Sequence, residues 1–146
     1  MCLPISVHYN LIEIASKIHQ DLQAESPVEL MVRANGSDDG TIEIDVEYLA
    51  VKDFLGKLQI WITEDGIVAP QMLPDGTLDS NYIHNHVLRS AVNGTWGDDI
   101  SWPSGSQGML KFSAELQQDW NPLHLSVVAF VYDDKGVHQV CQCKVI

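Results

Sequence analysis

Apolar and acidic residues alternate along the one stretch that decides the fold, Thr41-Ile42-Glu43-Ile44-Asp45-Val46-Glu47-Tyr48-Leu49. Successive side chains of a β-strand point to opposite faces, so this period of two predicts a strand with one buried face and one wet face. The preceding run, residues 28–34, is also strand-like, and residues 35–40 between the two runs are rich in Asn, Asp and Gly, which favour turns. The two runs therefore predict a β-hairpin.

The chain after this hairpin continues in the same style. Apolar and polar residues alternate at 58–63 and 110–116, so each of these segments predicts a half-buried strand. Residues 123–132 are apolar at nearly every position after His124, which is typical of a central strand covered on both sides. A turn at 133–136 then leads into residues 137–146 and predicts a terminal hairpin.

The chain before the hairpin has a different period. Apolar residues recur there at three- and four-residue steps, at Leu11, Ile14, Ala15, Ile18 and Leu22. This is the period of an amphipathic helix, which we expect to open near Ser6 and to end before Pro27.

These patterns together predict a mainly β fold. With 146 residues the chain is about one domain long. We expect an antiparallel two-layer β-sandwich, immunoglobulin-like or jelly-roll-like, with one N-terminal helix. We expect residues 1–26 to form the helical segment, which either packs on the domain or ends a preceding domain, and residues 27–146 to form the sandwich.

The charge of the chain excludes two classes of partner. Twenty acidic and eight basic residues give a formal net charge of −12, which repels phosphate backbones, so we expect no nucleic-acid partner. The basic residues are scattered singly and offer no stripe for an anionic lipid surface. No apolar run approaches the roughly 18 residues that a membrane-spanning helix requires.

Three phrases of the sequence carry a resemblance to a known family. They are Trp61-Ile62-Thr63-Glu64-Asp65-Gly66-Ile67-Val68-Ala69-Pro70-Gln71, Asn81-Tyr82-Ile83-His84-Asn85-His86-Val87-Leu88-Arg89 and Asn93-Gly94-Thr95-Trp96-Gly97. With these phrases the chain resembles, from about Pro27 to its end, the Bacteroidetes outer-membrane lipoprotein family typified by a 28-kilodalton Porphyromonas protein.

The resemblance implies a location and a role. Members of that family are lipid-anchored at the outer membrane and are regarded as surface adhesins or receptors, so the resemblance implies a host or bacterial surface protein or glycan as partner. This sequence has no lipobox, leader or Cys-x-x-Cys, so we expect it to be the C-terminal portion only, with any lipid anchor outside it. The alternative is an accessory β domain of a thioredoxin-like thiol oxidoreductase encoded upstream, because longer relatives carry such a domain before the β domain.

Two pairs of residues invite a metal-binding interpretation. His84 and His86 lie two apart, so on a strand both would point to the same side and offer two ligands. Cys141 and Cys143 have the same spacing. Two ligands are too few for a structural zinc site, so we expect no metal and no cofactor. The histidines keep two interpretations, a structural role near a loop junction or a place in a binding surface.

The remaining candidates are tryptophans on connecting segments. Residues 65–81 and 93–108 are the longest stretches without strand periodicity, and loops on a rigid scaffold often carry binding residues. Trp96 and Trp102 flank an acidic loop in the second stretch, and exposed tryptophans are frequent anchors at interfaces. No Gly-x-Ser-x-Gly motif occurs, and we expect no catalytic residues and no enzymatic activity.

Overall fold

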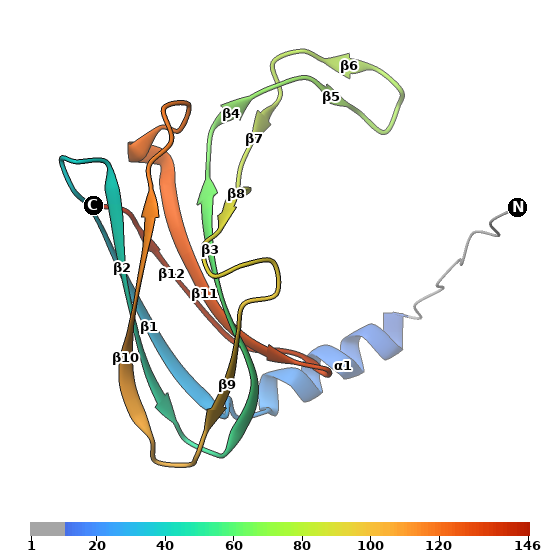
Figure 1. Cartoon of the computed structure of the whole chain (residues 1–146). Coiled ribbons are helices and arrows are strands. Elements are labelled where there is room, and N and C mark those ends of the chain that lie inside the picture. Colours follow the sequence, from blue (N-terminus) through green and yellow to red (C-terminus); the bar gives the residue numbers. More distant parts are fainter. Residues whose placement is uncertain (1–10) are drawn as a thin grey trace, which may run out of the picture.

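A computed structural model describes residues 11–146, in which two antiparallel sheets face each other (Figure 1). The first sheet has the strand order β1-β2-β10, with β1 (Val28–Gly36), β2 (Thr41–Ala50) and β10 (Gln107–Glu115). The second has the order β12-β11-β3-β8, and β9 also pairs with β3; its strands are β3 (Phe54–Glu64), β8 (Val87–Ala91), β9 (Asp98–Trp102), β11 (Leu125–Asp133) and β12 (Gly136–Lys144). The predicted antiparallel, mainly β fold is thereby confirmed.

Both predicted hairpins are present. β1 and β2 pair from Val28↔Ala50 to Gly36↔Ile42 without a register shift, and β11 and β12 pair on either side of the turn at residues 134–135. The core lies between the two sheets, because the apolar residues of each alternating strand point inward. Its fully buried side chains come mainly from β2, β3 and β11 and include Ile42, Ile44, Val46, Leu58, Ile60, Ile62, Val127 and Val131.

The prediction that β3 is wet on one face was wrong. Gln59 and Thr63 alternate with the core residues, yet they are only 2% and 6% exposed. The chain between β8 and β9 folds over the outer face of β3, where Asn93 Oδ1 accepts hydrogen bonds from Gln59 Nε2 (3.2 Å) and from the Ile60 N–H (2.9 Å). Gly97 makes this close approach possible, because a Cβ there would collide with the carbonyl of Leu58.

The two long sides of the sandwich differ. One side is closed where β1 meets the end of the chain: Ala34 forms a parallel bridge with Val145, and the Gly36 N–H donates to the Ile146 carbonyl at 2.8 Å. On the opposite side β10 pairs, among the described residues, with β2 alone. The first sheet therefore ends there in an edge strand.

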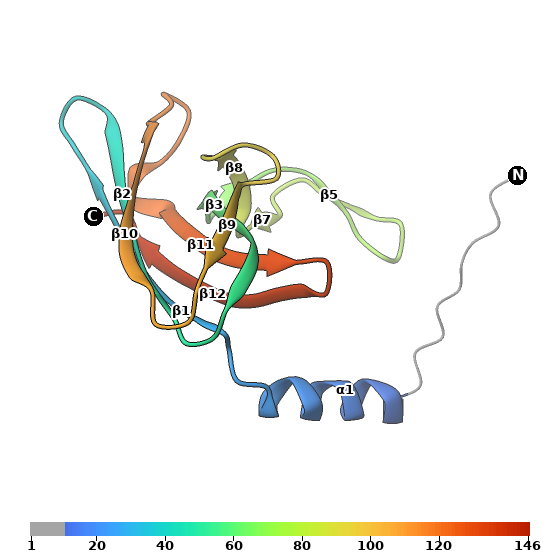
Figure 2. The ribbon, with the colours of Figure 1, turned by 60° about the horizontal axis from the view of Figure 1, so that its bottom comes forward.

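The predicted helix is confirmed as α1 (Leu11–Gln23), and its expected opening near Ser6 lies outside the described residues. Figure 2 shows α1 set apart from the sheets and joined to β1 by a short link. Its apolar stripe is exposed, with Ile14, Ile18 and Leu22 at 38%, 54% and 80%. No helix within residues 11–146 has the length and apolar character needed to cross a membrane.

Candidate functional site

A projecting arm, residues 65–86, leaves the sandwich between β3 and β8 (Figure 1). It is a bent ribbon of four short strands: β4 (Ile67–Val68) pairs with β7 (Ile83–His84), and β5 (Gln71–Met72) pairs with β6 (Leu78–Asp79). The prediction that residues 65–81 lack strand structure was therefore too simple. Pro70 separates β4 from β5, because proline cannot donate to a ladder, and Pro74 lies in the turn between β5 and β6.

The neck of the arm is fixed by short polar contacts. Asp65 Oδ1 accepts from the His86 N–H at 2.8 Å, and Asn85 Oδ1 accepts from the Gly66 N–H at 2.9 Å. Lys144 Nζ on β12 lies 3.1 Å from Asp65 Oδ2 and ties the neck to the sandwich. The hydrogen bond from His86, followed by that from Lys144, holds the pKa of the Asp65 carboxyl below its usual value. These contacts fix the base of the arm on the second sheet.

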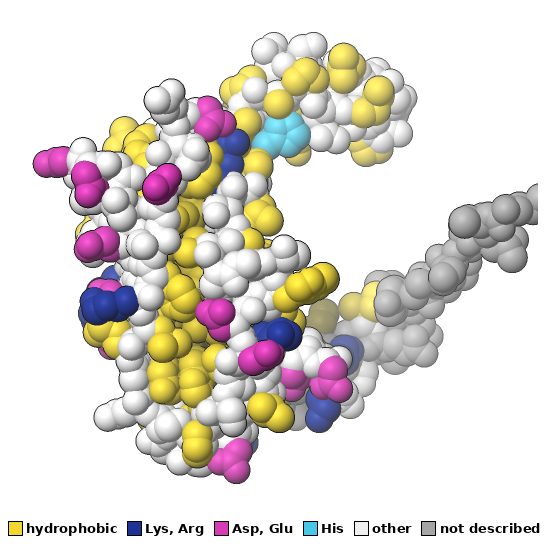
Figure 3. Space-filling model, viewed as in Figure 1, with side chains coloured by type: hydrophobic (Ala, Val, Ile, Leu, Met, Phe, Trp, Pro, Cys, Tyr) yellow, Lys and Arg dark blue, Asp and Glu magenta, His cyan; other side chains and the backbone are white. Residues whose placement is uncertain are grey.

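The outer part of the arm exposes aliphatic side chains in cross-strand pairs. Val68 pairs with Ile83 and Met72 pairs with Leu78, and all four side chains are 59–61% exposed. Their ladder neighbours point the other way and are half-buried. Figure 3 shows the result as hydrophobic side chains on an arm with few charged groups. Residues 65–86 contain no Lys or Arg.

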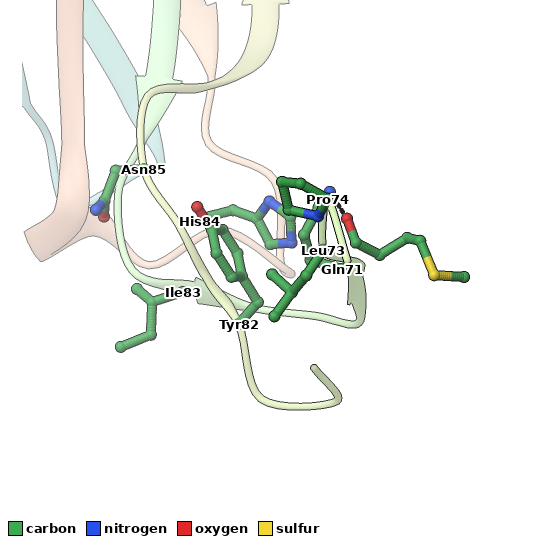
Figure 4. A pocket seen from close by; sticks show the side chains of 8 residues that line it. Gln71, Leu73, Pro74, Tyr82, Ile83, His84 and Asn85 are labelled. Carbon is green, nitrogen blue, oxygen red and sulfur yellow. Dashed lines mark hydrogen bonds between the residues drawn. The ribbon is translucent and has the colours of Figure 1, made fainter. Parts of the chain in front are cut away.

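The arm also carries a cavity. Residues 71–74 and 82–85 line a cavity of about 610 Å³ (Figure 4). Tyr82 and His84 meet edge to face within it, with ring centroids 4.9 Å apart, and His84 Nε2 lies 3.3 Å from the Ala69 carbonyl oxygen. The cavity thus combines an aromatic pair with apolar and amide side chains.

The two candidate histidines do not share one face. His84 ends β7 and is half-buried in the cavity, whereas His86 has φ 56° and an exposed side chain near Asp65. The condition for a shared face, that both lie on one strand, is not met, because the left-handed residue His86 turns the chain from the arm into β8. Among residues 11–146 no group of three or more His, Cys, Asp or Glu side chains is placed to hold a metal ion.

Trp96 and Trp102 lie in different environments. Trp96 is 73% exposed, and its carbonyl accepts a hydrogen bond from the Tyr132 hydroxyl at 2.6 Å. Trp102 is only 7% exposed and stacks on Tyr48, with ring centroids 3.8 Å apart and planes within 5°. The expectation of an exposed Trp102 is corrected: residues 98–102 form strand β9, whose pairing with β3 turns this side chain into the core.

The aliphatic pairs of the arm were not among the sequence candidates. Exposed aromatic residues are the more frequent interface anchors, and this segment lacks the long periodic run that predicts strands. A usable signal was present, since Val68, Met72, Leu78 and Ile83 are apolar residues in a segment rich in turn residues, where no core face is available to them.

Comparisons with known proteins agree with this architecture. The profile of the family described as outer membrane protein Omp28 matches residues 5–146, which extends further toward the N-terminus than the expected boundary at Pro27. No curated protein matches the chain.

Two solved structures from Porphyromonas gingivalis have a similar fold. A domain of the outer membrane lipoprotein Omp28 is 21% identical with a TM-score of 0.57, and the match covers 84% of this chain and 90% of that one. HBP35 is 15% identical with a TM-score of 0.66, and the match covers 92% of this chain but 46% of that one. The chain thus spans about half the length of HBP35.

Proposed function

Because this chain belongs to the Omp28 family of outer membrane proteins, we propose that it is a non-catalytic binding module whose projecting arm holds a protein partner. The observation that carries the proposal is the pairing of Val68 with Ile83 and of Met72 with Leu78 on exposed faces. Exposed aliphatic side chains that gather on a projection are typical of interaction sites.

The chemistry of the arm favours a protein over a glycan. Sugar sites rely on aromatic platforms and on dense polar groups, whereas the arm exposes four aliphatic side chains and contains one tyrosine, Tyr82, and no Phe or Trp. Aliphatic pairs gain free energy by removing apolar surface from water, at about 25 cal/mol per Å². A protein partner with its own apolar surface can cover these side chains. Holding such a partner is the role of an adhesin or receptor.

The family gives the chain its place at the outer membrane. A lipid anchor outside this chain is the attachment that we propose, with the arm facing the partner on the cell surface. The alternative of an accessory domain for a thioredoxin-like oxidoreductase finds no support in the comparisons.

Site-specific crosslinking on living cells tests the role of the arm. A photoreactive amino acid in place of Met72 is expected to form a discrete adduct with one protein, identifiable by mass spectrometry. The same residue in place of Leu55, which is 76% exposed on β3, is the matched control and is expected to give no such adduct. Equal adducts at both positions, or none at Met72, would contradict the arm as the contact site.

Affinity then measures how much the aliphatic pairs contribute. Met72→Lys with Leu78→Lys is expected to weaken binding of the captured protein by about tenfold or more, because buried apolar anchors dominate interface energy. The melting temperature is expected to change little, since both side chains are exposed and far from the core. Unchanged affinity would show that Met72 and Leu78 do not contribute to binding.

A further inference from the structure

The outer edge of β10 offers unpaired backbone groups. The Ala50 N–H donates to Ser106 O and the Leu116 N–H donates to Gly40 O, each at 2.8 Å, and the register between these bonds is unbroken. Residues of an antiparallel pair alternate between hydrogen-bonded and non-hydrogen-bonded positions. The backbone N–H and C=O groups of the even-numbered residues of β10 therefore bond to β2, and those of the odd-numbered residues point away from β2, toward the open edge. No residue within 11–146 hydrogen-bonds to the outward groups of Met109, Lys111 and Ser113.

This edge lacks most of the features that usually protect an edge strand. Nine residues of β10 pair with β2 without a bulge, and the strand contains no proline. Lys111 is its only basic residue, and its Nζ is already held 2.9 Å from Asp45 Oδ1. A long regular edge of this kind is a template for another strand.

A strand added to β10 would also find apolar surface. Leu110, Phe112 and Ala114 point from β10 toward the core and are only partly buried, and Val92 and Trp120 are partly buried against the same core. Figure 3 shows hydrophobic side chains gathered in a stripe along this side of the sandwich. Every second side chain of an added strand would cover this stripe.

The solvent face of the edge sets the charge of the partner. Glu43 is the register partner of Ser113, and Lys111, which is attracted to both Glu43 and Asp45, forms its ion pair with Asp45 and none with Glu43 among the described residues. Glu43, Asp45, Lys111, Phe112 and Ser113 line a depression of about 260 Å³ on this edge. Ser113 is small, so a basic side chain opposite it on an added strand would reach Glu43 across it.

We propose that β10 is a second docking site, which accepts one extended strand of a protein partner in antiparallel pairing. The strand has apolar residues at alternate positions, which cover the stripe, and basic residues on its solvent face, one of which pairs with Glu43. Backbone hydrogen bonds to Met109, Lys111 and Ser113 supply affinity, and the alternating side chains supply specificity. This site is separate from the arm, so its failure leaves the arm proposal intact.

A synthetic nine-residue peptide of alternating valine and lysine tests the proposal. In antiparallel pairing, residues opposite each other share a face, so the lysines of the peptide direct their backbone groups to β10. N-methylation at the lysines should therefore weaken binding by about tenfold or more, whereas N-methylation at the valines should change it by less than about threefold. Equal binding of the two methylated peptides would overturn the proposal.

Variants of the protein give a second readout. Glu43→Lys is expected to weaken binding of the valine–lysine peptide several-fold, whereas Glu29→Lys on the far strand β1 makes the same charge change and should have a much smaller effect. A peptide of alternating serine and lysine should not bind measurably. If the serine–lysine peptide binds as tightly as the valine–lysine peptide, or if the two charge variants weaken binding equally, the peptides are attracted by net charge alone. Either result would refute the site.

Hydrogen exchange locates the contact directly. Saturating valine–lysine peptide should slow amide exchange at Met109, Lys111 and Ser113, whose N–H groups are otherwise open to water. Ser113→Pro removes one of these donors and should weaken binding, while Ser113→Ala keeps the donor and should not. Protection confined to the arm, or binding unaffected by Ser113→Pro in a protein with an unchanged melting curve, would contradict docking at β10.

Discussion

Arg89 Nε lies 2.6 Å from Glu64 Oε2, and this ion pair joins the first strand after the arm to the last residue before it. The Glu64 side chain is 5% exposed and that of Arg89 is 23% exposed. Glu64 Oε1 also accepts from the Asn121 N–H at 2.9 Å, which holds the segment before β11 against β3. The pair therefore connects three segments that are distant in the sequence.

Removal of Arg89 should destabilise the fold. Arg89→Ala leaves the Glu64 carboxylate buried with one partner fewer, and we expect the free energy of unfolding to fall by about 2–4 kcal/mol. Urea denaturation measures this loss. Arg33→Ala is the control, because Arg33 and Glu47 form an exposed pair at 2.8 Å whose loss should cost about 0.5 kcal/mol or less. Equal losses in the two variants would show that burial of Glu64 does not matter.

The same carboxylate should make stability depend on pH. Burial raises the pKa of Glu64, but the hydrogen bonds from the Asn121 N–H and Arg89 outweigh burial and hold the pKa below its usual 4.5. A carboxyl whose pKa is lowered by folding stabilises the fold above its unfolded pKa and loses that contribution as pH falls through its folded pKa. Glu64→Gln should be less stable than the parent at neutral pH, with a difference that shrinks on acidification below pH 4.5. Urea titrations across this range measure it, and a difference that stays constant would contradict the assignment.

The two tryptophans should respond in opposite ways to truncation. Trp102→Ala removes a buried ring from its stack on Tyr48 and should lower the free energy of unfolding by about 3–5 kcal/mol. Trp96→Ala removes an exposed ring and keeps the carbonyl that binds Tyr132, so the change should stay within about 0.5 kcal/mol. Thermal or urea unfolding compares them, and a large loss for Trp96 alone would reverse the assignment of surface and core.

The strand cysteines should be poor nucleophiles in the folded protein. Burial, followed by the nearby Cys143, raises the pKa of Cys141 to about 11, and burial also raises that of Cys143. Because the thiolate is the reactive form, both should react slowly with Ellman's reagent at neutral pH and rapidly in urea. Cys2→Ser removes the third thiol, so that the signal comes from this pair. Reaction of the native variant at the rate of a free thiol would contradict the burial.

Local features of the chain could be predicted from the sequence. The hairpins β1–β2 and β11–β12 follow from alternating apolar residues on either side of turn-forming residues, and α1 follows from apolar residues at helical spacing. Each of these signals lies within a short segment, so it depends little on the rest of the chain.

The environment of single residues could not be predicted in this way. Gln59 is buried because a loop more than thirty residues later covers it, and Trp102 is buried because β9 pairs with β3. His84 and His86 separate because a left-handed residue ends the arm, and the aliphatic pairs of the arm face water because the ribbon leaves the sheets. The sequence by itself determined which segments become strands, since periodicity is local. Only the tertiary structure decided which faces are covered, because burial depends on contacts between segments far apart in the chain.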